Sequence, residues 1–173
     1  MVPESQLSFI GDTRVVDVDE QSPSPWKLWV DGAARNNPGP AGAGIYLCKD
    51  TSVVARQGFF LGSRTNNQAE YLALLLGIFY FVRSTPPGDT IHIISDSQLL
   101  VRQMIGKYRV KNADLLRMQQ CAFALLKGYT CYFFHVAREF NTEADKLANV
   151  GIDKRRYPPT EFVKLLQTYE ITF

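Results

Sequence analysis

The chain has 173 residues, of which 46% are hydrophobic and 21% are charged, and these values predict one ordinary domain with a sizeable core. The net charge of +2 is only mildly basic, so a polyanionic partner would have to be held by a local patch and not by a global field. Three widely spaced cysteines without a Cys-x-x-Cys pattern argue against a disulfide framework or a zinc site and favour the reducing cytoplasm. The longest apolar run, residues 71–82, is too short to cross a bilayer, so we expect no membrane association.

The first half of the chain predicts an extension followed by strands. Residues 1–25 are expected to form an N-terminal extension and linker, with a short strand at 14–18. Three runs of strand-forming residues then follow, joined by tight connections, which indicates an antiparallel meander. These three strands are predicted at 26–31, 43–48 and 53–61.

The periodicity then changes to that of a helix. Residues 68–83 are apolar nearly all round after a possible cap at 65–67, which predicts a helix covered on several sides. A β-branched run at 90–94 predicts a central strand. The remaining predicted elements are helices at 97–105 and 113–127, a strand at 130–136, and helices at 142–150 and 160–167. This order predicts an α/β fold in which helices flank a mixed sheet that begins with the meander.

Four carboxylates lie at the ends of these predicted elements. Asp31 follows the first strand, Glu70 lies in the first turn of the long helix, Asp96 follows the central strand, and Asp145 lies in the first turn of a late helix. Each has a purely structural alternative. Asp31 suits a turn and Asp96 a helix cap, Glu70 has the capping-box spacing from Asn67, and Asp145 favours a helix dipole.

Taken together, two of these acids converge if their strands are parallel neighbours, because the ends of such strands lie on one rim of the sheet. Clustered carboxylates repel one another, so the pKa of at least one should rise unless a divalent cation compensates the charge. Hard oxygen ligands suit magnesium or manganese, and two such ions about 4 Å apart can activate a water and stabilise the leaving oxygen of a phosphodiester. The chemistry indicated is phosphodiester hydrolysis.

Four sequence blocks carry a resemblance to a known family. They read DGAARNNPGPAG, TNNQAE, SDSQ and NTEADKLA, and they begin at Asp31, Thr65, Ser95 and Asn141. In this order and at these spacings they resemble type 1 ribonuclease H, and the resemblance covers residues 26–152. Residues 153–173 then form a C-terminal tail, which we expect to include a helix packed on the domain.

The resemblance implies a ribonuclease H-like fold with a five-stranded mixed sheet and endonucleolytic cleavage of the RNA strand of an RNA/DNA hybrid. The products would carry 5′-phosphate and 3′-hydroxyl ends. The same resemblance implies that the four acids hold two Mg²⁺ ions, with Mn²⁺ as a possible substitute, and that the protein is a monomer. It also implies minor-groove contacts from a set of amide side chains and small-residue backbone groups. These residues are Ala33, Ala34, Arg35, Asn37, Asn66, Asn67 and Gln98.

One departure from the family concerns the segment before the last acid. Many bacterial members carry a histidine there that is thought to help product release, whereas residues 137–141 are shorter and contain none. Arg138 is the candidate substitute, and a surface ion pair with Glu139 is an equally good structural explanation for it. Because an arginine stays charged at neutral pH, it can hold a phosphate or product but is a poor proton shuttle.

A second departure is the short connection at 106–112, where some members insert a helix and a basic, tryptophan-rich handle. Lys107, Arg109 and Lys111 remain in this connection as a modest phosphate-contacting patch, with a solvated loop as the alternative. The sequence therefore resembles the compact, handle-free form of the family. A weaker grip and a stronger salt sensitivity are expected.

Three functions compete for this sequence. The first is a metal-dependent hybrid nuclease, and the second is a non-catalytic module that binds hybrid or duplex RNA on the same fold. The third is a related nuclease, either a retroelement-derived ribonuclease H or one that also cuts double-stranded RNA. The presence of all four acids argues against the second, because unneutralised negative charge beside phosphates would weaken binding.

Overall fold

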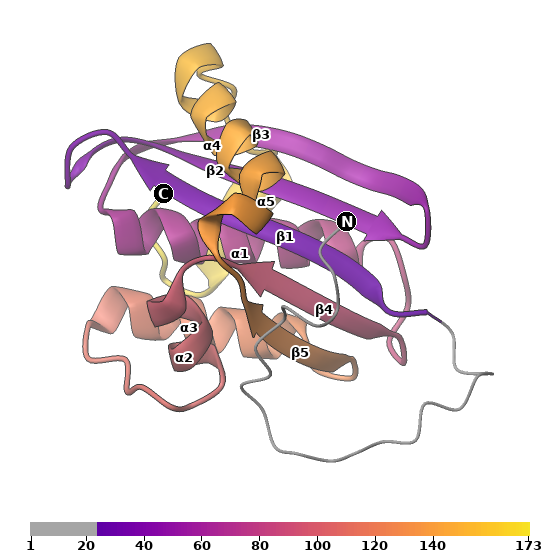
Figure 1. Cartoon of the computed structure of the whole chain (residues 1–173). Helices are drawn as coiled ribbons and strands as arrows, with labels where there is room; N and C mark the ends of the chain where they lie inside the picture. The colour runs from indigo at the N-terminus through magenta and orange to yellow at the C-terminus, as the bar shows by residue number, and fades with distance from the viewer. Residues whose placement is uncertain (1–23) are drawn as a thin grey trace.

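The computed structural model describes residues 24–173, so the strand predicted at 14–18 lies outside the described residues. One sheet of five strands, in the order β3-β2-β1-β4-β5, forms the centre of the molecule (Figure 1). The meander β1-β2-β3 is antiparallel, while β4 and β5 run parallel to β1. This arrangement confirms the predicted mixed sheet. The strands are β1 (Trp26–Ala34), β2 (Gly39–Lys49), β3 (Ser52–Arg64), β4 (Thr90–Ser95) and β5 (Thr130–His135).

Helices cover both faces of the sheet. In Figure 1 the sheet lies between α4, in front, and α1 and α3, behind it. None of the helices within residues 24–173 combines the length and the apolar character that a membrane span requires. The helices are α1 (Asn66–Val82), α2 (Gln98–Met104), α3 (Ala113–Leu125), α4 (Thr142–Lys154) and α5 (Thr160–Thr168), with a short 3-10 turn, η2 (Arg138–Phe140), before α4.

The register of β1 places its acid where two strands separate. The parallel ladder between β1 and β4 ends at the pair Trp29 and Ile94. Beyond that pair β1 continues for five residues, paired only with β2, so it ends at Ala34 and not at residue 31 as predicted. The strand is longer because small residues continue the hairpin with β2. Asp31 therefore lies inside β1 but just past the end of its ladder with β4.

Glycines set how closely the helices approach the sheet, and two of them lie beside or opposite Asp31. A Cβ built on Gly32 would overlap the backbone of Ala69 in α1, and a Cβ built on Gly44 would overlap the carbonyl oxygen of Ala144 in α4. Gly44 lies opposite Asp31 in the β1–β2 ladder. Because directly opposed residues share one face of a sheet, the Asp31 side chain and α4 lie on the same face.

The core extends from the sheet through α1 to the C-terminal tail. The α1 helix is buried over most of its length, as its apolar sequence predicts. On the far side of this helix, the ring of Phe162 in α5 is fully buried and contacts that of Phe79, with 5.6 Å between their centroids. Leu166 and Ile171 are also buried in the same cluster. The tail thus adds apolar residues to the core of the domain.

Candidate active site

Two strands deliver the central pair of acids. Asp31 is only 6% exposed, and Asp96 follows the last residue of β4 directly. Burial is the main cause that raises the pKa of Asp31 to about 7. The negative charges of Asp96 and Asp145 and a hydrogen bond with the Asp96 side chain raise it further, while Arg138 lowers it. The predicted convergence of the two strand ends is therefore present.

The third acid comes from α1. The helix begins at Asn66 and its capping box joins Thr65 to Gln68, so the capping role considered for Glu70 is wrong. Instead, Glu70 Oε2 accepts a hydrogen bond of 3.1 Å from the backbone N–H of Gly32, the residue after Asp31. Burial, followed by the charges of Asp31 and Asp96, raises the pKa of Glu70 well above its ordinary value. Glu70 thus faces the other acids.

The fourth acid is paired with an arginine. Asp145 lies in the first turn of α4, and its Oδ1 is 2.8 Å from Nη2 of Arg138 on η2. The ion pair that Arg138 forms is thus with Asp145 and not the one considered with Glu139. The hydrogen bond and charge of Asp145 raise the pKa of Arg138 above its ordinary value. Because Arg138 is 78% exposed, its guanidinium lies at the mouth of the acid cluster.

One buried amide joins these elements, and the sequence did not single it out. The Nδ2 group of Asn141 donates to Oδ1 of Asp96 at 2.7 Å and to the carbonyl of Val30 at 2.9 Å. Its own backbone carbonyl accepts from the backbone N–H of Asp145 at 3.1 Å. An asparagine before a helix is typical of a cap, which hides any other role. The available signal was its place in the same block as Asp145.

The acid cluster has the chemistry of a cation site, although its side chains already make other polar contacts. Within residues 24–173, no three acidic, histidine or cysteine side chains already stand at metal-binding geometry. Asp31 bonds to Asp96, Glu70 to a backbone N–H, and Asp145 to an arginine. The negative charge of neighbouring acids helps to raise the pKa of Asp31 and of Glu70, and a hard divalent cation would remove that cost. The donor set therefore fits magnesium or manganese.

The predicted substrate-binding loop is tied to α1. The backbone N–H of Ala34 donates to Oδ1 of Asn66 at 3.1 Å, and the backbone N–H of Asn66 donates to Oδ1 of Asn37 at 3.0 Å. These bonds place the β1–β2 turn beside the exposed first residues of α1. Arg35 in the same turn pairs with Asp153 at the end of α4, with 2.7 Å between Nη2 and Oδ1. The turn is therefore held to a helix on each face of the sheet.

The other predicted contacts surround the acids. Ala33 lies near the end of β1, Asn67 is exposed on the first turn of α1, and Gln98 is exposed as the first residue of α2. Ser97 caps α2, because its side chain accepts from the N–H of Leu100. Asp96 therefore does not make the cap hydrogen bond that was its structural alternative. The amide residues thus flank the acid cluster on two sides.

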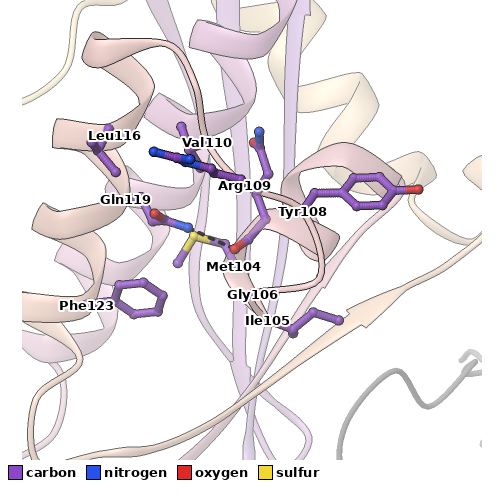
Figure 2. Close-up of a pocket in the computed structure, with 10 residues that line it drawn as sticks. Met104, Ile105, Gly106, Tyr108, Arg109, Val110, Leu116, Gln119 and Phe123 are labelled. Atoms are coloured by element: carbon purple, nitrogen blue, oxygen red, sulfur yellow. Dashed lines mark hydrogen bonds between the residues drawn. The ribbon is translucent and has the colours of Figure 1, made fainter.

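The predicted basic patch lies one short helix away from the acids. Lys107, Arg109 and Lys111 are all exposed in the connection between α2 and α3, and α2 has seven residues, or about 10 Å of length. A pocket of about 710 Å³ lies beside this connection. Figure 2 shows Arg109 extending toward α3 and Tyr108 pointing away from it. The lining residues are Gln103, Met104, Ile105, Gly106, Tyr108, Arg109, Val110, Leu116, Gln119 and Phe123.

Comparisons with known proteins agree with this geometry. The sequence profile of the family described as "Reverse transcriptase-like" matches residues 29–151. Ribonuclease HI of Halobacterium salinarum is 39% identical over 132 residues, which cover 72% of this chain and 63% of that protein. A bifunctional protein of Mycobacterium tuberculosis is also 39% identical, over 71% of this chain and 34% of its own length. The chain therefore spans less than two thirds of these relatives.

A solved structure extends the likeness to three dimensions. The crystal structure of LC11-RNase H1 in complex with an RNA/DNA hybrid superimposes with a TM-score of 0.71 and 32% sequence identity, covering 75% of this chain and 97% of that one. The strand order, the acid cluster and these matches lead to one conclusion. The chain belongs to the type 1 ribonuclease H family.

Proposed function

We propose that this protein hydrolyses the RNA strand of RNA/DNA hybrids. The observation that carries the proposal is the convergence of Asp31, Glu70, Asp96 and Asp145 where β1 and β4 separate. A solved relative that binds such a hybrid supports the choice of substrate. Exposed amides on both sides of the acids supply the hydrogen-bonding groups that a minor groove with 2′-hydroxyls requires.

The four carboxylates would hold two Mg²⁺ ions, with Mn²⁺ as a substitute. Bound there, the ions would activate a water and stabilise the leaving oxygen, giving 5′-phosphate and 3′-hydroxyl products. The chain itself supplies the oxygen ligands, and burial makes two of them, Asp31 and Glu70, costly to ionise without a cation. Because of this cost, we expect metal binding to be tightly coupled to the protonation of these acids.

The protein's own groups would bind and orient the hybrid. The Asn66 hydrogen bonds to Ala34 and Asn37 hold the β1–β2 turn and α1 as one unit, so both can contact the same groove. Arg138 would hold a phosphate at the mouth of the site, because its charge is exposed and directed toward Asp145. It serves there as a fixed positive charge.

A labelled-substrate assay tests this function. Hybrid, duplex RNA and duplex DNA are incubated with the protein in Mg²⁺ or Mn²⁺, beside an EDTA control and the Asp96→Asn variant. Asp50→Asn is the matched control, because Asp50 lies in the exposed β2–β3 turn. We expect cleavage of the RNA strand of the hybrid by the wild type and the control only.

The other outcomes separate the competing functions. Cleavage of duplex RNA as well would show the broader nuclease considered from the sequence. Binding of the hybrid without any cleavage would show that the protein is a binding module and not an enzyme. Gel filtration with light scattering of the same samples tests the expectation that the protein is a monomer.

A further inference from the structure

Asn141 occupies the N-cap position of α4 but does not cap the helix. Asparagine is among the residues preferred at this position, where its side-chain oxygen normally accepts from a backbone N–H in the first turn. The side chain of Asn141 makes no such hydrogen bond. It is only 1% exposed, and its amide is directed at Asp96 and at the carbonyl of Val30 instead.

The orientation of this amide is determined by chemistry. Its Nδ2 group donates to two oxygens, the carbonyl of Val30 and Oδ1 of Asp96, whereas its Oδ1 is buried without a partner among residues 24–173. Turning the amide over would place Oδ1 against two other acceptors and lose both hydrogen bonds. The Asn141 amide therefore donates to the Asp96 carboxylate and to the Val30 carbonyl of β1, while its Oδ1 stays buried without a partner among the described residues and makes no cap hydrogen bond.

We infer that Asn141 is a positioning residue for the acid cluster, an inference that rests on the proposed function. Through its two side-chain bonds it fixes the carboxylate of Asp96 relative to β1 at the residue before Asp31. Through its backbone carbonyl it holds the N–H of Asp145. One residue thus joins the three elements that carry three of the four acids. The hydrogen bond to Oδ1 of Asp96 also selects which carboxylate oxygen faces a cation, as outer partners of metal ligands do.

The test compares two Asn141 variants with a matched control on the same helix. Asn141→Ala removes both donated bonds, and Asn141→Ser keeps one small hydroxyl group at the cap position. The control is Asn149→Ala, which loses a bond from Nδ2 to the main-chain carbonyl of Asp145 but none to a carboxylate. The readouts are kcat and KM on hybrid, Mn²⁺ affinity by calorimetry, and the melting temperature in EDTA.

We expect the Asn141 variants to lower kcat and leave KM for the hybrid almost unchanged. Both Asn141 variants should lose about 10–100-fold in kcat and bind Mn²⁺ about tenfold more weakly, with KM for the hybrid within about twofold of the wild type. Asn149→Ala should keep kcat and Mn²⁺ affinity within about twofold. The melting temperature of Asn141→Ser should fall less than that of Asn141→Ala, because a serine can cap the helix.

Two results would overturn the inference. One is wild-type kcat and Mn²⁺ affinity in a folded Asn141→Ser or Asn141→Ala variant, which would leave Asn141 a purely structural residue. The other is an equal loss in Asn149→Ala, which would show a general effect of α4. If the wild type cleaves no hybrid, the proposed function fails, whereas the Mn²⁺ titrations still decide the role of Asn141.

Discussion

At the scale of single residues, the acid cluster works against the stability of the cation-free fold. Asp31 and Glu70 are held where their charged forms are disfavoured, since burial raises the pKa of both and neighbouring acids raise them further. Under the proposed function, a divalent cation bound by these acids would relieve this repulsion. A cluster of this kind is typical of a functional site and not of a structural one.

The first prediction concerns Asp31 and pH. Its folded pKa of about 7 exceeds the ordinary 3.8, so the folded protein binds more protons than the unfolded chain between about pH 4 and 7. Stability from this group is present below pH 4 and is lost as the pH rises through 7. In EDTA, Asp31→Asn should therefore raise the melting temperature little at pH 4.5 and by about 5–10 °C at pH 8.

Thermal melts of the wild type and Asp31→Asn across this pH range check the prediction. Saturating Mg²⁺ should stabilise the wild type more than the variant, because the variant lacks a ligand and a ligand that binds only the folded state raises its stability. An advantage of the variant that is constant with pH would contradict the assigned pKa.

Single residues also show where sequence reasoning succeeded and where it did not. Asp31 and Asp96 were predictable because each follows a run of strand-forming residues, and neighbouring parallel strands bring such ends together. The role of Asn141 was not predictable, because its partners Val30 and Asp96 lie 111 and 45 residues away. A cap residue and a residue that donates to a carboxylate look the same in one sequence.

At the scale of elements, the placement of α4 depends on glycines that leave no room for a Cβ, and Gly44 is the one opposite Asp31. Gly44 on β2 leaves no room for a Cβ beneath Ala144, so α4 packs directly on the strand next to Asp31. Gly44→Ala should push the start of α4, with Asp145, away from the sheet. Overpacking of this kind costs about 1–3 kcal/mol, and kcat should fall with the melting temperature.

The matched comparison is Gly77→Ala in α1. The atoms nearest to a Cβ at Gly77 are side-chain methyl carbons of Leu28 and Val30 and not backbone atoms, and alanine favours the helix by about 1 kcal/mol over glycine. Melting curves and kcat of both variants check the prediction. A Gly44→Ala variant as active and stable as Gly77→Ala would show that α4 tolerates the displacement.

The connection between α2 and α3 makes a prediction about salt. The affinity for the hybrid falls as salt rises, and removing one phosphate-binding side chain should make the slope of log affinity against log salt less steep by about 0.7–0.9. Lys107→Ala and Lys111→Ala should each show this less steep salt slope for hybrid binding, because both side chains are exposed in this connection. Lys164→Ala on α5 is the control with an unchanged slope. Fluorescence anisotropy over a salt series measures all three, and unchanged slopes for the loop variants would identify a merely solvated loop.

At the scale of the whole molecule, the sheet was predictable and its extent was not. The switch from alternating to helical periodicity at residue 65 marks the crossover from β3 to α1, and the β-branched run at 90–94 marks a buried parallel strand. The lengths of β1 and β2 depend on small residues that pair without a strand-like pattern. Close packing by α4 makes those small residues necessary, and this packing is not visible in local sequence.

The C-terminal tail carries the last prediction. Phe162 is fully buried against Phe79 of α1, and Arg64, next to the cap of that helix, donates to the carbonyl of Thr172 and contacts the ring of Phe173. Phe162→Ala should therefore cost about 3–5 kcal/mol, since it leaves a large cavity between two helices. For a chain of this size that corresponds to a melting temperature lower by about 6–20 °C.

The acid cluster is formed by other elements, so kcat of Phe162→Ala should stay near the wild-type value below its melting transition. Glu161→Ala, at an exposed position of the same helix, is the control and should melt like the wild type. Equal stability of both variants would show that α5 rests on the domain without supporting it. A loss of kcat in the fully folded Phe162→Ala variant would instead show that the tail acts through α1 on Glu70, which would connect the packing of α5 to the geometry of the acids.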